Sequence, residues 1–277
     1  MKTIEQDNNH ASLGPQRALV EGPGQSNLEM GTDGETTGRS PKRLARIAGI
    51  LYLLVGISGG FAEGFVYPKI YVAGNAAKTA ENLVANSGLV RLGVVADLFD
   101  NTVWILLALT LYLLFKHVHK GAARAMVVFV AVGAGITCLN AVFEFEALRV
   151  ATGKVGSAAF GIAGSNSLAL ILTDTQHYGL LIAQIFFGLW LVPLGCLAYR
   201  SGWFPKALGI LLIVGAACYL VDMLAAFLLP GVGQVIHGYI TIPSAIAEIS
   251  MVVYLLVIGM KADTAGPSHP VVEVATH

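Results

Sequence analysis

The stretch ALGILLIVGAACYLVDMLAAFLL, residues 207–229, decides the fold class of this chain. It is apolar throughout except for one acid, Asp222, and it contains no lysine or arginine. At 1.5 Å per residue, a helix of this length is about 34 Å long, slightly more than the roughly 30 Å hydrocarbon core of a bilayer. The stretch therefore predicts a membrane-spanning helix.

Other apolar stretches of sufficient length complete a set of six predicted spans. In chain order the six cover residues 44–62, 89–115, 122–148, 168–198, 207–229 and 240–260. The fourth is too long for one straight span, so its first turns are expected to lie outside the membrane or to tilt. The sequence thus predicts an all-α, polytopic transmembrane helix bundle within residues 43–261.

Composition supports this class and excludes others. Only 12% of the residues are charged, against about 25% in a soluble domain, and the mean hydropathy is +0.70. Lysine plus arginine and aspartate plus glutamate balance at 17 each, so no basic field for nucleic acid exists. Cys138, Cys196 and Cys218 fall inside apolar stretches without metal-binding spacing, and we interpret them as small packing residues.

Both ends of the chain are polar. Residues 1–42 are rich in Gly, Asn, Gln and Thr and lack the apolar core of a cleavable signal peptide. They are expected to form a disordered cytoplasmic tail, and residues 262–277 a second, shorter one.

Basic residues predict the orientation of the bundle. Nine lie near the face on which the chain enters the first span, and five lie near the opposite face. The nine are Lys42, Arg43, Arg46, Lys116, Lys120, Arg124, Arg200, Lys206 and Lys261; the five are Lys69, Lys78, Arg91, Arg149 and Lys154. Both termini are therefore predicted to be cytoplasmic.

Two of the predicted external connections are longer than a hairpin needs. Residues 73–85 predict a short interfacial helix, whereas residues 149–167 are rich in Gly, Ser and Ala and read as a connector. Either segment caps a pocket that opens outward, or both lie on the lipid headgroups. On the first span, Gly56, Gly60 and Gly64 form a ladder of small residues, which is expected to let another helix pack closely.

Acidic side chains mark the candidate site. Asp97, Asp222 and Glu248 lie in three different apolar helices, each about 10–12 Å from the same membrane face when residues are counted at 1.5 Å rise. Charged groups at membrane depth are costly and seldom face lipid. We therefore expect the three carboxyl groups to converge within about 10 Å in one internal polar pocket.

Further polar residues are expected to join these acids. Asn101 follows Asp97 by one helical turn, Asn140 and Glu144 are similarly spaced, and His177 and Gln184 are seven residues apart. The candidate ligand-binding residues are Asp97, Asn101, Asn140, Glu144, His177, Gln184, Asp222 and Glu248. Because few cations accompany so many acids, some must be protonated or neutralised by a bound cation.

Three functions fit this pattern. The leading hypothesis is a binding or transport protein whose outward-facing acidic pocket holds a small polar or cationic ligand. The first alternative is a metal-dependent intramembrane hydrolase of a lipid-like substrate, with His177, Asp97 and Asp222, joined by His237 or Glu248, as zinc ligands that activate a water. The second is a structural or accessory membrane protein without a ligand. No zinc-protease, phosphate-loop, dinucleotide or nucleophile-elbow motif occurs, so we expect no metal or cofactor and assign no catalytic residue.

Several short runs resemble a known family. They are Arg46-Ile47-Ala48-Gly49, Arg91-Leu92-Gly93, His177-Tyr178-Gly179, Ile185-Phe186-Phe187-Gly188-Leu189, Tyr199-Arg200-Ser201-Gly202-Trp203 and Tyr219-Leu220-Val221-Asp222. Together with Tyr52, Asp97, Pro243 and Glu248, they are similar to prokaryotic multi-pass membrane proteins known as domain of unknown function 4386. The resemblance covers about residues 42–262. It implies a helical protein of the bacterial inner membrane, and it implies no reaction.

Overall fold

The computed structural model describes residues 41–260, so the predicted tails at 1–42 and 262–277 lie almost entirely outside the described residues. The described part consists of helices and their connections, with no strand, which confirms the all-α prediction. Six of its helical segments are long and apolar enough to cross a membrane, as the hydropathy pattern predicted. They are Pro41–Ile70, Ser87–Phe115, Lys120–Ala151, Ala158–Ser201, Lys206–Leu228 and Val235–Val257.

Three of the spans are continuous α-helices, and three contain a break. The first span is built from α1 (Pro41–Gly59), the π-helical segment η1 (Gly60–Val66) and α2 (Tyr67–Ile70). The next four are α4 (Ser87–Phe115), α5 (Lys120–Ala151), α6 (Ser157–Ser201) and α7 (Lys206–Leu228). The last is formed by α8 (Pro230–Ile240) and α9 (Ile242–Val257).

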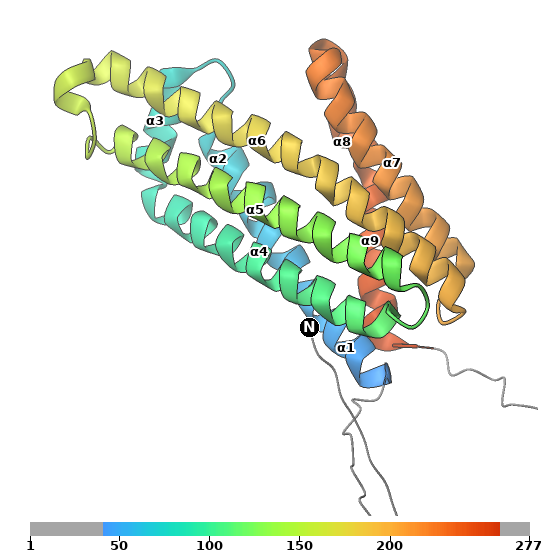
Figure 1. The fold of residues 1–277 in the computed structure, drawn as a ribbon. Helices are drawn as coiled ribbons and strands as arrows, with labels where there is room; N and C mark the ends of the chain where they lie inside the picture. Colours follow the sequence, from blue (N-terminus) through green and yellow to red (C-terminus); the bar gives the residue numbers. More distant parts are fainter. Residues whose placement is uncertain (1–40, 261–277) are drawn as a thin grey trace, which may run out of the picture. The chain divides into compact units, whose positions relative to one another are not determined.

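The six spans pack in a closed ring. Each packs on the next along the chain, from α1 to α4, α5, α6, α7 and α9, and α9 packs back on α1 (Figure 1). Small residues allow the closest approaches. A Cβ at Gly195 would lie 2.7 Å from the carbonyl oxygen of Gly209, and the reverse holds equally, so α6 and α7 touch through their backbones.

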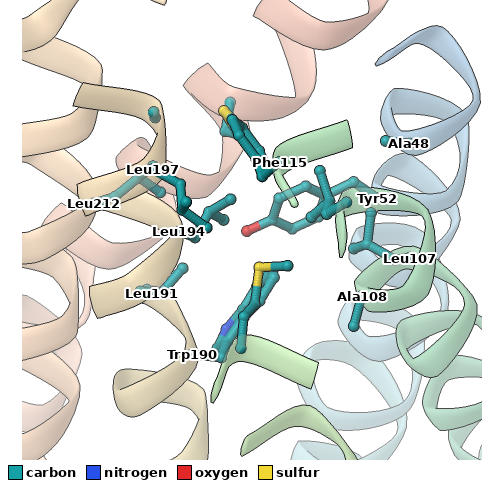
Figure 2. Close-up of a cluster of buried hydrophobic side chains, with 14 of the residues drawn as sticks. Ala48, Tyr52, Leu107, Ala108, Phe115, Trp190, Leu191, Leu194, Leu197 and Leu212 are labelled. Carbon is teal, nitrogen blue, oxygen red and sulfur yellow. The ribbon is translucent and has the colours of Figure 1, made fainter. Parts of the chain in front are cut away.

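A small apolar cluster with Ile70, Leu83 and Leu148 lies at one end of the bundle, and the main apolar core fills the ring at the other end. This end contains the start of α1, the end of α9 and the α4–α5 and α6–α7 turns. There Tyr52, Leu107, Trp190 and Leu194 meet in the middle of the ring, and all are buried (Figure 2). Because this core closes only one half of the bundle, the other half is left to enclose polar groups.

The π-helical segment lies in that second half of the first span. It carries Glu63 and follows Ser58, whose Oγ donates to the carbonyl oxygen of Leu54 at 2.7 Å. A π-helical turn leaves backbone groups out of the regular α-helical pattern, and such turns are frequent at functional sites. Hydropathy alone gave no indication of this irregularity, since it does not distinguish an α-helical turn from a π-helical one.

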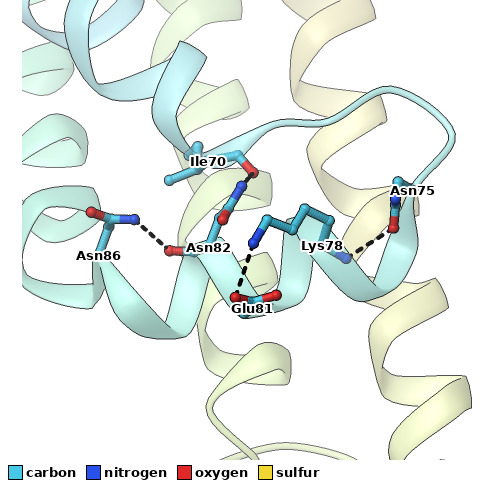
Figure 3. Close-up of polar contacts among 6 residues, drawn as sticks. All are labelled: Ile70, Asn75, Lys78, Glu81, Asn82 and Asn86. Carbon is cyan, nitrogen blue, oxygen red and sulfur yellow. Dashed lines mark hydrogen bonds and ion pairs between the residues drawn. The ribbon is translucent and has the colours of Figure 1, made fainter.

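The predicted helix at residues 73–85 is present as α3 (Ala76–Ala85). The Asn75 side chain begins it by accepting a hydrogen bond from the backbone N–H of Lys78 at 3.0 Å (Figure 3). The Asn82 amide holds α3 beneath the first span by donating to the carbonyl of Ile70 at 3.4 Å. Lys78 pairs with Glu81 on the exposed side.

Two connections differ from the predictions. Residues 149–167 are not a connector: α5 continues to Ala151, and α6 begins at Ser157. The Gly-rich composition there marks the short connection between the two helices, with Gly153 and Gly156 at positive φ, and a break at Gly161, which has φ 63° and ψ −178°, a conformation that glycine adopts easily. The last span begins earlier than predicted, at Pro230, and breaks at Thr241, because Pro243 has no N–H to continue the α8 hydrogen-bond pattern.

The ladder of small residues on the first span does not pack as expected. No atom of the described chain comes within 4 Å of a Cβ built on Gly56, Gly60 or Gly64. The spacing predicted close packing of another helix on these glycines, but within residues 41–260 no helix contacts them.

Candidate functional site

A cavity of about 410 Å³ occupies the half of the ring that the apolar core leaves open. It begins where the core ends, at Trp104 and Trp190, and all six spans contribute to its wall. The lining residues are Val55, Gly59, Glu63, Asp97, Asp100, Asn101, Trp104, Thr137, Asn140, Gln176, Leu180, Gln184, Phe187, Trp190, Tyr219, His237, Thr241 and Glu248.

Three acids come from the neighbouring elements η1 and α4. They are Glu63, Asp97 and Asp100. Asp100 Oδ1 accepts a hydrogen bond from Ser58 Oγ at 2.9 Å, and Glu63 Oε1 accepts one from Gln176 Nε2 at 3.2 Å. Both donors are neutral, and no lysine or arginine is among the described residues that line the cavity. This wall therefore gathers three carboxyl groups with no described lysine or arginine beside them.

Asn101 and Thr137 lie beside these acids. Asn101 Nδ2 donates to the carbonyl oxygen of Asp97 at 2.8 Å, and the Thr137 hydroxyl donates to Asn101 Oδ1. The contact holds α4 to α5 and fixes the Asn101 amide, which is buried. It is a satisfied polar contact of the kind that also stabilises helix pairs in membranes.

Glu248 on α9 is held by two tyrosines. Tyr52 donates its hydroxyl to Glu248 Oε2 at 2.8 Å, and Tyr219 donates to Oε1 at 2.9 Å. These two contacts join α1, α7 and α9 at the level where the core gives way to the cavity. Each carboxylate oxygen thus has a defined donor, so the orientation of Glu248 is fixed by neutral groups.

A second polar group adjoins Glu248. Gln184 Nε2 donates both to the carbonyl oxygen of Tyr219 at 3.0 Å and to Asp222 Oδ2 at 2.7 Å. His237 Nδ1 lies 2.8 Å from the same Asp222 oxygen. Asp222 is 1% exposed and sits behind Gln184 and His237, which both face the cavity.

Five buried side-chain polar atoms have no hydrogen-bond partner among the described residues, and three of them lie in or directly behind the cavity wall. These three are Asn140 Nδ2, Gln176 Oε1 and Asp222 Oδ1. Asn140 and Gln176 line the cavity and are 6% and 2% exposed. Leaving a buried donor or acceptor unpaired costs about 1–3 kcal/mol, so the wall carries polar groups that are suited to a bound molecule or to water.

The sequence-predicted candidates do not all reach the cavity. Asp97, Asn101, Asn140, Gln184 and Glu248 line it, and Asp222 is one hydrogen bond away. Glu144 is buried one turn beyond Asn140 and is not part of the lining.

His177 occupies a different place. Its ring stacks on Tyr67, with centroids 5.9 Å apart, and on Tyr71 at 5.7 Å. Tyr71, which follows the first span, donates its hydroxyl to Asp174 Oδ1 at 2.6 Å. Burial and this carboxylate acceptor raise the pKa of Tyr71 above its ordinary value, so the phenol stays neutral and the contact persists. The cluster joins α2 to α6 at the end of the bundle away from Trp104 and Trp190.

Sequence reasoning missed several lining residues. Glu63, Asp100 and His237 line the cavity, but none of them was among the predicted site residues. The only signal for Asp100 was its spacing of three residues from Asp97. Gln176 gave no signal, since a glutamine inside a span is equally common in helix contacts. Tyr52, which donates to Glu248, is not part of the lining and stood out only through the family resemblance.

Comparison with known proteins places the chain in a family. Residues 47–259 match the profile described as "Domain of unknown function (DUF4386)". An uncharacterized protein of Archaeoglobus fulgidus is 43% identical over 54 residues, a stretch that covers 19% of this chain and 33% of that protein. The match therefore spans about a third of the length of that relative. No solved structure matches the chain.

Proposed function

The chain belongs to the DUF4386 family, a domain of unknown function, and we propose that it binds a small cationic ligand in the acidic cavity of its transmembrane bundle. One observation carries the proposal. Glu63, Asp97, Asp100 and Glu248 line one cavity together with a single histidine and no described lysine or arginine. Ionised carboxylates inside a membrane protein need a counter-charge, and here a ligand supplies it.

The polar atoms without partners support a ligand rather than a purely structural role. In a structural role each acid pairs with hydroxyl or amide donors, as Glu248 does with its two tyrosines. That account leaves the Asn140 and Gln176 atoms unsatisfied although both face the cavity. A bound cation with polar substituents satisfies them and the acids at once.

The orientation follows from the basic residues. Arg46, Lys120, Arg124 and Lys206 lie at the end of the bundle that the apolar core closes. If that end is cytoplasmic, as basic residues favour, the cavity belongs to the outer half of the membrane. We accordingly propose an outward-facing site, as in a transporter or receptor that takes its ligand from outside the cell.

The metal-dependent alternative has less support. His177 stacks between two tyrosines away from the cavity, while Asp222 pairs with Gln184 and His237. Within residues 41–260 no three His, Cys, Asp or Glu side chains group in a way that would hold a metal ion. Of the zinc ligands that this hypothesis named, Asp222 and His237 are in contact and Asp97 and Glu248 line the same cavity, but His177 lies elsewhere.

Binding to the purified protein tests the proposal. Thermal unfolding in detergent is followed with sodium, potassium, calcium, ammonium and methylammonium chlorides at constant ionic strength. At least one cation is expected to raise the melting temperature in a saturable way, since a ligand that binds only the folded state stabilises it. Asp97→Asn and Asp100→Asn should abolish the shift.

The matched control is Glu146→Gln. Glu146 pairs with Arg149 outside the cavity, so its loss should leave the cation effect unchanged. A cation site in the cavity would be contradicted if Glu146→Gln and Asp97→Asn changed the cation effect equally. It would also be contradicted if no inorganic cation and no amine raised the melting temperature of the parent protein.

A further inference from the structure

The cavity has two chemically different ends. Along α6 its lining changes from Gln176 through Gln184 to Phe187 and Trp190. Along α4 it changes in the same direction, from Asp97 and the acids that follow to Trp104. The polar end therefore lies away from the apolar core and the aromatic end lies against it.

The aromatic end is a rigid cluster of rings. Trp104 meets Trp190 edge to face with centroids 5.7 Å apart, and it meets Phe187 at 5.2 Å. Phe187 in turn meets Tyr219 at 6.4 Å. Trp104 and Trp190 are buried, whereas Phe187 and Tyr219 are partly exposed, so the last two present ring surface to the cavity.

We infer that the cavity takes a protonated organic amine with an apolar body, with the ammonium group among the carboxylates and the body on the aromatic floor. The inference rests on the proposed function and specifies its ligand class. A bare inorganic cation fits less well. Calcium takes six to eight oxygen ligands in a close shell, whereas this cavity of about 410 Å³ is far larger than an ion and has a floor of carbon.

An amine matches the polar end in hydrogen bonding as well as in charge. Gln176 donates its Nε2 to Glu63, which leaves Oε1 as an acceptor without a described partner. An ammonium N–H supplies the missing donor, which a quaternary ammonium ion lacks. Asn140 Nδ2 is the opposite case, a donor that a ligand hydroxyl or carbonyl would satisfy.

The aromatic floor adds attraction for the same ligand. Aromatic rings pair favourably with one another, and apolar groups gain from leaving water. The cavity volume lies in the range of pockets that hold small organic molecules, about 300–1,000 Å³. Charge, shape and hydrogen bonding thus select one chemical class.

A homologous series of probes tests this inference on the purified full chain. Methylammonium, propylammonium, butylammonium and phenethylammonium chlorides are titrated while tryptophan fluorescence is followed, because Trp104 and Trp190 line the cavity. Affinity is expected to rise roughly fourfold for each added methylene. Phenylethanol, which keeps the aromatic body without the charge, should bind at least tenfold more weakly than phenethylammonium.

Two variants locate the effect. Phe187→Leu keeps the bulk but removes the ring, and it should weaken phenethylammonium on the order of twofold to tenfold while leaving methylammonium nearly unchanged. Phe99→Leu is the matched control, because Phe99 is 49% exposed on α4 and does not line the cavity. Asp100→Asn should weaken the binding of phenethylammonium. Partition of the amine into detergent would not depend on this carboxylate, so the variant distinguishes binding in the cavity from partition.

The outcomes separate this inference from the proposed function. If methylammonium or an inorganic cation binds but affinity does not grow with the apolar body, the amine class is wrong and the cation site stands. If phenylethanol binds as well as phenethylammonium, or if Phe99→Leu and Phe187→Leu act alike, the inference is likewise overturned. If neither any amine nor any inorganic cation binds, both proposals fail.

Discussion

Gly179 on α6 lies so close to Asn140 on α5 that a Cβ at position 179 would be 2.1 Å from Asn140 Oδ1. Asn140 lines the central cavity, and it also lines a groove on the outside of α5 and α6 together with Tyr178. Tyr178 and Ile171 in that groove are largely exposed. The Asn140 side chain is thus the partition between the cavity and the surface that faces lipid, and Gly179 leaves room for it.

This contact predicts that Gly179→Ala displaces the Asn140 amide. Overpacking of this kind typically costs about 1–3 kcal/mol, although alanine is the better helix former. The free energy of unfolding, measured in mild detergent, should fall accordingly. In the double variant Gly179→Ala, Asn140→Ala the clash is removed, so the effect of Gly179→Ala should largely vanish. Additive effects of the two changes would show that the contact is not real.

The hydroxyl of Tyr52 is expected to hold Glu248 in place. Tyr52→Phe removes the donor to Glu248 Oε2 and should lower stability by about 0.6–2 kcal/mol, while the ring keeps its place in the core. Tyr239→Phe is the control, because Tyr239 is 76% exposed. Combination with Glu248→Leu should show non-additive losses, since that change leaves the Tyr52 hydroxyl without its acceptor.

The sequence was sufficient for the spans but not for their arrangement. Hydropathy determines which segments enter the membrane, so the six spans were predictable. It does not indicate which helix faces which, so the closure of the ring between α9 and α1 was not. The ladder at Gly56, Gly60 and Gly64 has the right spacing for a helix contact and has none among the described residues, whereas isolated Gly195 and Gly209 form one.

The candidate site, like the fold, was predictable from the sequence only in part. The cost of buried charge pointed to Asp97 and Glu248 without any structure, and both line the cavity. Depth along a helix does not fix the direction of a side chain relative to a cavity. His177 and Gln184 lie on one side of an ideal helix, yet the residue that joins Gln184 in the cavity is Gln176. The π-helical turn that carries Glu63 has no recognisable sequence pattern.

The basic residues predict the topology of the bundle. Reporter fusions placed after Lys120 and after Arg200 should report the cytoplasm, and a fusion after Gly156 should report the opposite side. The reason is the excess of lysine and arginine at the end formed by the α4–α5 and α6–α7 turns. Fusions that read the other way round would invert the bundle and make the cavity face the cytoplasm.

Metal analysis tests the hydrolase alternative directly. Protein purified without chelators is expected to contain far less than one equivalent of zinc, because the described histidines and acids do not group as ligands. His177→Ala should lower stability through the lost stacking on Tyr67 and Tyr71 without changing the metal content. Near-stoichiometric zinc that is lost in this variant would favour the hydrolase over the cation-binding protein.

Asp222 offers a way to separate charge from structure. In Asp222→Asn the amide oxygen can still accept from Gln184, and the new NH₂ group takes the place of Oδ1, which has no partner among the described residues. Stability should therefore change by only a few tenths of a kcal/mol. In Asp222→Leu the Gln184 amide loses this acceptor, at a cost of about 1–3 kcal/mol.

The same pair of variants distinguishes a ligand site from a scaffold. If the negative charge of Asp222 helps to hold a cation, Asp222→Asn should weaken phenethylammonium or methylammonium binding although the fold is intact, because a neutral amide no longer offsets the charge of the ligand. Asp174→Asn, which removes an acid that contacts Tyr71 and lies outside the cavity, should leave binding unchanged. Unaltered binding in Asp222→Asn, with loss only in Asp222→Leu, would assign Asp222 to the support of Gln184 alone.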